Sequence, residues 1–192
     1  FRDLRGPTAW GDDSAFAPPA GNDVDTVTHV LNRLTFGVRP RDHARVSALG
    51  QTSRDSSERF IAKQLDPEHL KDTRADYAIA RYDFLRESVG ELYEYKAELL
   101  RGALASSALL RAIYSERQLY EVMVHFWSDH FNIDISKGDC RWLKAADDRA
   151  VIRAHALGSF GNLVRASATS PAMLWYLDGR VNRRTAAAEK PN

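Results

Sequence analysis

The sequence predicts an all-α fold, an irregular multi-helix bundle with no significant sheet. Apolar residues recur at helical spacing through most of the chain, and no segment alternates between apolar and polar residues for long enough to form a strand. No repeat of fixed length occurs either. With 192 residues and a hydrophobic fraction of 44%, the chain is long enough for one domain with its own core.

The chain divides into three parts by composition. Residues 1–23 contain several Gly and Pro residues and no apolar period, which predicts an extended arm. Residues 24–178 carry the helical pattern and are expected to form the folded domain. Residues 179–192 are polar and predict a flexible tail.

The first helix is predicted from Asp25 to about Gly37. Its apolar residues lie three or four positions apart and form one stripe, made of Val27, Val30, Leu31 and Leu34. Two short helices are expected at 41–49 and 56–66.

Residues 73–114 are predicted to be helical almost throughout. Gly90 and Gly102 are the expected breaks, because a glycine inside a helix is less stable than an alanine by about 1 kcal/mol.

A further helix follows the sequence SERQ (115–118), which has the pattern of a capping box. At about 100° per residue, one broad stripe of this helix is expected to be buried, with His125 on the exposed flank. The stripe contains Leu119, Val122, Met123, Phe126, Trp127 and His130.

The last helices are predicted after a loop at 132–140. Asp147 or Asp148 is expected to cap a helix over 149–157, which Gly158 ends or interrupts before the helical pattern continues to residue 170. Pro171 suits the first position of a final helix.

Charge and cysteine content exclude several kinds of protein. Lys and Arg number 27 and Asp and Glu 26, so a net charge of +1 gives no electrostatic argument for nucleic acid or an anionic membrane. No run approaches the roughly 18 apolar residues that span a bilayer. A single cysteine, Cys140, excludes an internal disulfide framework and a cysteine-based zinc site. The absence of a Gly-rich phosphate loop, a nucleophile elbow and a Cys/His dyad argues against nucleotide binding and serine or cysteine hydrolase chemistry.

The histidines are the first candidates for a site. His125 and His130 lie about 140° apart on an α-helix, so they cannot bind one ion together. His130 and His155 both fall on inward stripes, either as core hydrogen-bonding residues or as ligands of a transition metal such as Cu, Fe or Zn. The second interpretation predicts one shared polar pocket, with Asp129 and Asp178 orienting the rings.

The arginines offer a second candidate. Arg149 and Arg153 lie one turn apart and could grip a substrate carboxylate or hold Asp147 and Asp148. The alternative is a solvated face of salt bridges.

Four segments together resemble a known family. HVLNRLTFG (29–37), MVHFWSDHFNI (123–133), RAHALGSFGNLV (153–164) and SPAMLWYLD (170–178) are similar, in order and spacing, to the bacterial domain of unknown function 1800 family. The resemblance covers residues 26–192. It implies a helical protein without a settled biochemical activity, often exported by the twin-arginine route, and therefore an extracytoplasmic location, periplasmic or secreted.

The resemblance also implies residues beyond this chain. In the family, a segment like NENYARELLELHTLG follows soon after the YLD motif, and Asn192 matches its first residue. We therefore expect this chain to be the N-terminal part of a larger protein, with the C-terminal remainder as its partner in the site. Ser128 stands where many relatives have a second histidine, whereas His130 matches.

Three hypotheses about function follow. The first is an exported metal-dependent enzyme, with oxidoreductase chemistry slightly favoured over hydrolase chemistry. The second is a non-catalytic binding or assembly module that acts with an exported partner protein. The third is a purely structural helical domain.

Overall fold

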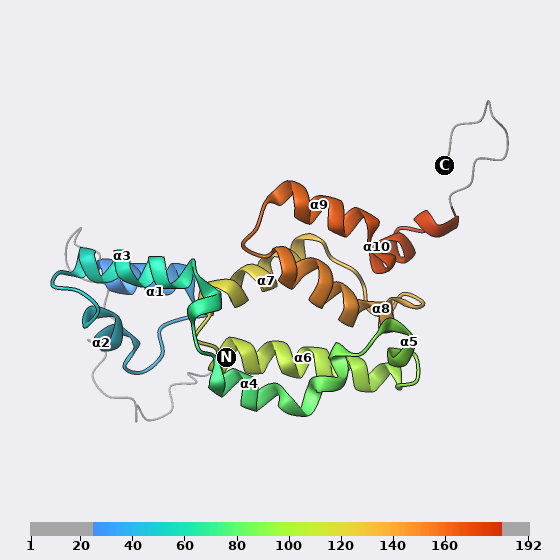
Figure 1. The fold of residues 1–192 in the computed structure, drawn as a ribbon, viewed down its shortest axis with the longest axis horizontal. Coiled ribbons are helices and arrows are strands. Elements are labelled where there is room, and N and C mark those ends of the chain that lie inside the picture. The colour runs from blue at the N-terminus through green and yellow to red at the C-terminus, as the bar shows by residue number, and fades with distance from the viewer. Residues whose placement is uncertain (1–24, 182–192) are drawn as a thin grey trace, which may run out of the picture.

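The computed structural model describes residues 25–181, and this part of the chain is helical without any strand. The predicted all-α fold is confirmed. The helices form a small N-terminal cluster beside a body of three layers (Figure 1). The predicted arm lies outside the described residues. Of the predicted tail, only the short 3-10 helix η5 (Gly179–Val181) is described.

The N-terminal cluster consists of α1 (Thr26–Leu34), α2 (Asp42–Ser47) and α3 (Ser53–Gln64), which pack against one another. The Asp25 carboxylate caps α1 by accepting hydrogen bonds from the backbone N–H groups of Val27 (3.3 Å) and Thr28 (3.0 Å). The core of the cluster contains Val27, Val30, Leu31, Val46 and Phe60. The apolar stripe predicted for the first helix is therefore confirmed at its three buried positions.

The first layer of the body contains α4 (Thr73–Ile79), the 3-10 helix η3 (Ala80–Arg86), α5 (Val89–Leu92) and the long α6 (Ala97–Tyr114). The short 3-10 helix η2 (Pro67–His69) leads into it. Helix α4 packs on α6.

The breaks predicted in this layer are misplaced. Gly90 and Gly102 lie inside α5 and α6, and the helices are interrupted at 87–88 and 93–96 instead. Ser88 and Glu91 form a capping box that starts a new helix, whereas the small unfavourable contribution of one glycine does not break an 18-residue helix.

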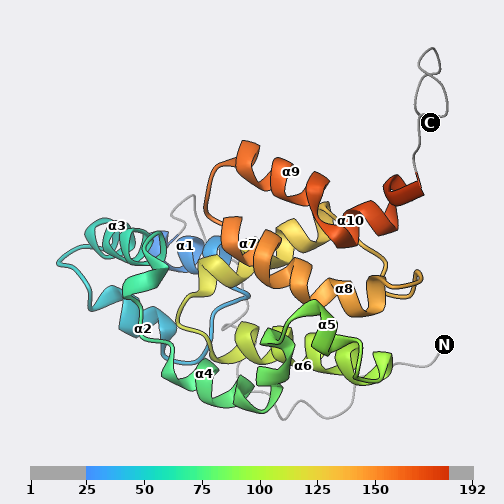
Figure 2. The ribbon, with the colours of Figure 1, turned by 45° about the vertical axis from the view of Figure 1, so that its right-hand side comes forward.

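The second layer contains α7 (Gln118–His130), α8 (Cys140–Asp147) and the π-helical segment η4 (Asp148–Arg153). The third contains α9 (Phe160–Thr169) and α10 (Pro171–Tyr176). Two views agree that α9 and α10 cover the side of α7 and α8 that faces away from α4 and α6 (Figures 1 and 2). Pro171 is the first residue of α10, as predicted, and the Ser170 hydroxyl caps this helix.

Two predicted helix starts are wrong because the residues expected to cap them bind other partners. At α7 the SERQ sequence forms no capping box; the buried Asp72 carboxylate accepts hydrogen bonds from the Ser115 hydroxyl and the Glu116 N–H, both at 2.7 Å. Asp147 does not begin a helix either, because α8 continues directly into η4. Its buried carboxylate accepts a hydrogen bond from the Ser170 hydroxyl at 3.0 Å.

The buried face predicted for α7 is correct only in part. Leu119 is buried and His125 exposed, as expected, and Val122, Met123 and Trp127 are half-buried. Phe126 is 52% exposed, which contradicts the prediction. Glu121 and Val124 are buried instead, at about 200° and 140° from Leu119. The buried face of α7 depends on the polar partners of its side chains as well as on hydrophobicity, and the spacing of apolar residues does not reveal those partners.

Among residues 25–181, no helix is long and apolar enough to cross a membrane.

Candidate functional site

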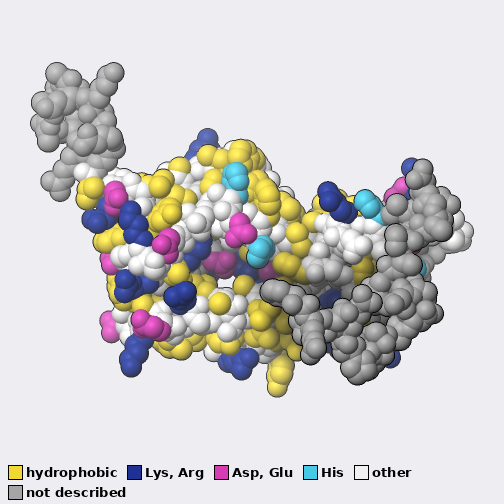
Figure 3. All heavy atoms as spheres, turned by 180° about the vertical axis from the view of Figure 1, so that it is seen from behind, with side chains coloured by type: hydrophobic (Ala, Val, Ile, Leu, Met, Phe, Trp, Pro, Cys, Tyr) yellow, Lys and Arg dark blue, Asp and Glu magenta, His cyan; other side chains and the backbone are white. Residues whose placement is uncertain are grey.

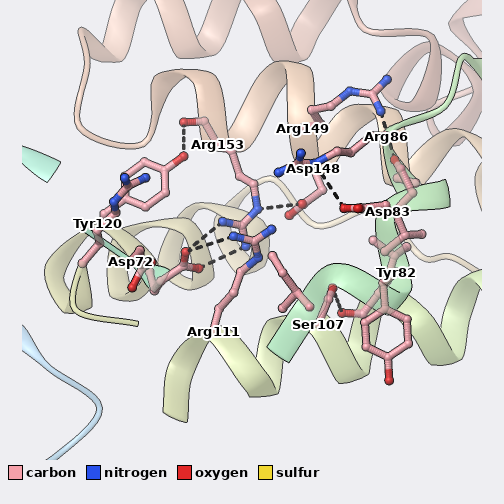
Figure 4. Close-up of a pocket in the computed structure, with 16 residues that line it drawn as sticks. Asp72, Tyr82, Asp83, Arg86, Ser107, Arg111, Tyr120, Asp148, Arg149 and Arg153 are labelled. Carbon is pink, nitrogen blue, oxygen red and sulfur yellow. Dashed lines mark hydrogen bonds and ion pairs between the residues drawn. The ribbon is translucent and has the colours of Figure 1, made fainter. Parts of the chain in front are cut away.

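A cavity of about 210 Å³ lies between the first two layers of the body, enclosed by α4, η3, α6, α7, α8 and η4 (Figure 4). We call it the arginine-lined cavity. Its lining contains five arginines and four carboxylates, an excess of one positive charge. The arginines are Arg86, Arg111, Arg117, Arg149 and Arg153, and the carboxylates are Asp72, Asp83, Glu121 and Asp148.

A buried ion-pair cluster forms one wall of this cavity. The Arg153 guanidinium contacts both oxygens of Glu121, Nη1–Oε1 at 3.0 Å and Nη2–Oε2 at 3.1 Å, and its Nε donates to Asp148 Oδ2 at 2.9 Å. The Glu121 and Arg153 side chains are only 4% and 15% exposed. Burial alone would lower the pKa of Arg153, but the attraction of Asp148 and then Glu121 outweighs burial and raises it. This arginine is therefore fully engaged within the protein.

The π-helical backbone of η4 is what places Asp148 and Arg153 together. In a regular α-helix, the side chains of residues five apart point about 140° away from each other, as for His125 and His130. A π-helix closes its hydrogen bonds over five residues, so residues 148 and 153 lie about one turn apart and can pair. Short π-helical segments occur frequently at functional sites. Here the segment supplies Asp148, Arg149 and Arg153 to one cavity.

Arg111 is the exception among the buried arginines. Its side chain is 21% exposed, and its nearest carboxylate oxygen, Glu121 Oε1, is 3.9 Å from Nη1, too far for a hydrogen bond. Within the described part of the chain, its guanidinium makes no hydrogen bond. Burial, followed by repulsion from Arg153, lowers the pKa of Arg111. Figure 4 shows the Arg111 and Arg153 side chains extending toward each other from opposite layers.

The other walls are held by hydrogen bonds to backbone carbonyls. Arg149 Nη1 donates to the Leu85 carbonyl at 2.9 Å, and Arg117 donates through Nε and Nη2 to the Leu70 carbonyl at 3.1 and 3.0 Å. These contacts fix the cavity walls and leave Arg111 with donors that point into the space between them.

The sequence placed Arg153 correctly near a carboxylate, but the solvated alternative is wrong for this face. Arg149 and Arg153 point into the protein, and Arg153 binds Glu121 and Asp148 rather than solvent. Asp147 is not its partner, because that carboxylate pairs with Lys144 at 3.2 Å.

His130 does not lie on a buried face, which corrects its predicted inward position. It is exposed, and its ring stacks on Phe126 with centroids 6.0 Å apart and planes 12° apart. The last turn of α7 carries both rings to the surface. His155 is half-buried, and among residues 25–181 its ring forms no hydrogen bond or ion pair. Neither the arginine-lined cavity nor the hollow beside His130 is lined by His155.

The remaining predicted residues lie at the surface. Asp129 is exposed and pairs with His125, Nδ1–Oδ2 at 3.6 Å, and both line the open hollow that also contains His130. The two histidines that the helical angle separated therefore share one shallow surface. Asp178 is exposed and pairs with Lys137 at 3.0 Å.

These residues do not complete a metal centre. Between residues 25 and 181, no group of three or more His, Cys, Asp or Glu side chains has an arrangement that could hold a metal ion. A site for Cu, Fe or Zn at His130 or His155 would need ligands from outside the described residues.

Most charged residues of the arginine-lined cavity were not predicted from the sequence, including Arg111 and Glu121. These two residues each had a detectable signal. Arg111 lies on the same helical stripe as Leu100 and Leu104, and Glu121 stands between apolar residues of α7. A charged residue on an apolar stripe of a predicted core helix indicates a buried ion pair or a site.

One comparison with known proteins gives a match. The family model described as "Protein of unknown function (DUF1800)" matches residues 29–190. Among curated proteins and among solved structures, none matches the chain.

Proposed function

The chain belongs to the DUF1800 family of proteins of unknown function, and from that premise we propose that it is a binding module whose ligand carries an anionic group held by Arg111 in the arginine-lined cavity. The group is a carboxylate or a phosphate, the two anions whose geometry an arginine fork matches best.

The proposal rests on Arg111, whose guanidinium is largely buried and makes no hydrogen bond within the described residues. The Arg111 side chain is only 21% exposed, but within the described residues no side-chain nitrogen without a hydrogen bond is fully buried, so the unpaired Arg111 donors can be reached by an anion from solvent. Its nearest carboxylate is already bound at both oxygens by Arg153. An anion in the cavity would satisfy Arg111 and would compensate the excess positive charge of the lining.

The rigidity of the walls supports the same conclusion. Arg117 and Arg149 are fixed by hydrogen bonds to backbone carbonyls, so they contribute a positive field without having to rearrange. The free donors of Arg111 therefore face a preorganised pocket, and preorganisation reduces the entropy lost on binding.

Calorimetric titration of the protein with inorganic phosphate and with acetate tests this proposal. We expect saturable binding of at least one anion, and at least a tenfold weaker Kd in Arg111→Gln, because a charge-assisted hydrogen bond contributes about 1.5–3 kcal/mol. Arg101→Gln is the matched control, since Arg101 lies on the same helix but is exposed. Equal loss in both variants, or no anion binding at all, would refute the proposal.

The metal-dependent enzyme and the exported location are separate proposals. The location rests on the four sequence segments, and the enzyme rests on His130. Metal analysis of the protein and of its His130→Ala variant tests the enzyme. Stoichiometric metal that disappears with His130 would support the enzyme; its persistence in the variant would remove His130 from any centre.

A further inference from the structure

A surface hollow lies between α4 and α6 and shares no lining residue with the arginine-lined cavity. It measures about 790 Å³, and its lining is Arg74, Tyr77, Ala78, Arg81, Leu110 and Tyr114. We call it the Arg/Tyr hollow. Hydrophobic and basic side chains lie next to one another along the lower edge of the body, which α4 and α6 form (Figures 1 and 3). A cavity of this size is within the range of small-molecule sites.

Two packed helices place these side chains around one space. The four lining residues of α4 and η3 lie three or four positions apart and therefore form one stripe. The two from α6, Leu110 and Tyr114, lie one turn apart and face this stripe, because α4 packs on α6. Ala78 stands between the two arginines of the stripe, and its small side chain leaves space there.

The charge of the hollow is uncompensated. Its lining contains Arg74 and Arg81 and no acidic residue, so it carries two positive charges. Among residues 25–181, neither guanidinium forms an ion pair or a hydrogen bond, and that of Arg81 lies over the Tyr82 ring, 5.1 Å from its centroid. Two like charges that line one hollow repel each other, and an anion between them offsets that repulsion. The hollow therefore favours an anion, and a dianion matches its charge best.

The aromatic rings of the hollow also lack partners. Tyr77 is 87% exposed and Tyr114 is 43% exposed, and within the described residues neither ring packs against another aromatic ring. An exposed tyrosine ring forgoes the large stabilisation that aromatic side chains gain from burial. Two exposed rings beside two guanidinium groups favour a ligand with a planar ring of its own, which can stack on a tyrosine while its anionic group binds arginine.

We propose that the Arg/Tyr hollow binds an aryl phosphate, a phosphate monoester of an aromatic alcohol. The phosphate lies between Arg74 and Arg81, and the aromatic ring packs against Tyr77, the more exposed of the two tyrosines. A phosphate monoester carries a charge of about −1.5 to −2 near neutral pH, which matches the two arginines, and its oxygens fit the arginine fork. A carboxylate supplies only one charge. This site does not involve Arg111 and goes beyond the proposed function.

Titration calorimetry with phenyl phosphate tests this inference, in the unchanged protein and in Arg111→Gln, which removes the site of the proposed function. We expect a saturable site that persists in Arg111→Gln. In that background, Arg74→Gln and Arg81→Gln should each weaken the Kd by at least about tenfold, because each removes charge-assisted hydrogen bonds. Arg101→Gln is the matched control, exposed on α6 outside the hollow, and should leave the Kd unchanged.

A second ligand tests the role of the aromatic ring. Cyclohexyl phosphate has the same charge and a similar size but no aromatic face, and we expect it to bind about two to ten times more weakly than phenyl phosphate, the range that an aromatic pair contributes. Tyr77→Ala should remove this difference. Leu65→Ala, at a position that is 60% exposed and lies outside the hollow, should keep it.

Each outcome bears on one of the two sites. Phenyl phosphate binding that is lost in Arg111→Gln would place the ligand in the arginine-lined cavity and overturn this inference alone. Binding that survives the double change of Arg74 and Arg81 to Gln, or no binding of phenyl phosphate at all, would exclude the hollow. Equal affinities for phenyl and cyclohexyl phosphate would overturn the aromatic class of the ligand. A site that depends on Arg74 and Arg81, with no anion binding that depends on Arg111, would support this inference and refute the proposed function.

Discussion

Helix α1 of the N-terminal cluster and helix α7 at the centre of the body bury their faces in opposite ways. Helix α1 buries Val27, Val30 and Leu31 against Val46 and Phe60, so its buried face is wholly apolar. Helix α7 buries Gln118 and Glu121 together with Leu119 and Val124. The face of α1 therefore packs through hydrophobic contacts, whereas the face of α7 also needs polar partners.

The second arrangement leaves space, because hydrogen-bonding groups need directed partners and cannot be packed at arbitrary orientations. Cavities of about 210 and 420 Å³ lie on the two sides of Glu121, Asp148 and Arg153. The buried face of α1 therefore stabilises the fold through hydrophobic packing, whereas the buried face of α7 combines packing with a polar cluster that borders two cavities.

The largest effect should come from breaking the central ion pair. Glu121→Ala would leave Arg153 and Arg111 buried without their shared carboxylate, and we expect a loss of about 3–5 kcal/mol in the free energy of unfolding. Urea denaturation followed by circular dichroism measures this loss. Replacing both partners, Glu121→Leu with Arg153→Met, should recover most of it. Equal losses in the single and double variants would show that the pair does not couple.

A slightly smaller effect is expected from the apolar core of the N-terminal cluster. Leu31→Ala should lower the free energy of unfolding by about 2–5 kcal/mol, because it leaves a cavity beside Phe60. The same variant should bind anions with an unchanged Kd at temperatures where it is folded. A weakened anion affinity would mean that the N-terminal cluster is part of the site, and the contrast between the two regions would fail.

The sequence was informative where burial is purely hydrophobic. The stripe of α1 follows from spacing alone, and so does the all-α fold. The same reasoning misplaced Phe126 and His130, since the face of α7 is chosen by the partners of Gln118 and Glu121, which are distant in sequence. The start of α7 is a third case of the same kind, because the Leu119 N–H in its first turn donates to the side chain of the distant Gln64.

The candidate site was harder to predict than the fold for two physical reasons. The pairing of Asp148 with Arg153 requires a π-helix, and no composition signal distinguishes that backbone from an α-helix. The apolar stripe of α6 marks Arg111 as a buried charge, but only the tertiary structure shows that Arg153 already occupies its nearest carboxylate. Arg153 could be predicted as a candidate because it lies one helical turn from Arg149, a relation that the local sequence shows.

The smallest effect on stability is expected at the exposed end of α7. Phe126→Ala should change the free energy of unfolding by less than about 1 kcal/mol, because half of the ring is already in solvent at 52% exposure. His125→Ala should have a similarly small effect. A loss of about 3–5 kcal/mol in Phe126→Ala, typical of a core phenylalanine, would restore the face that the hydrophobic period predicts.

Nitrogen-detected NMR of the arginine side chains can show whether Arg111 holds an anion. The Nε–Hε signal of Arg111, assigned by its absence in Arg111→Gln, should shift in a saturable manner during titration with acetate or phosphate. The signals of the exposed Arg54 and Arg101 should move only slightly and linearly with salt. If Arg111 binds the anion, we expect its shift to be saturable, with the same Kd as the calorimetric titration. An Arg111 signal that stays unchanged, or moves no more than that of Arg54, would contradict it.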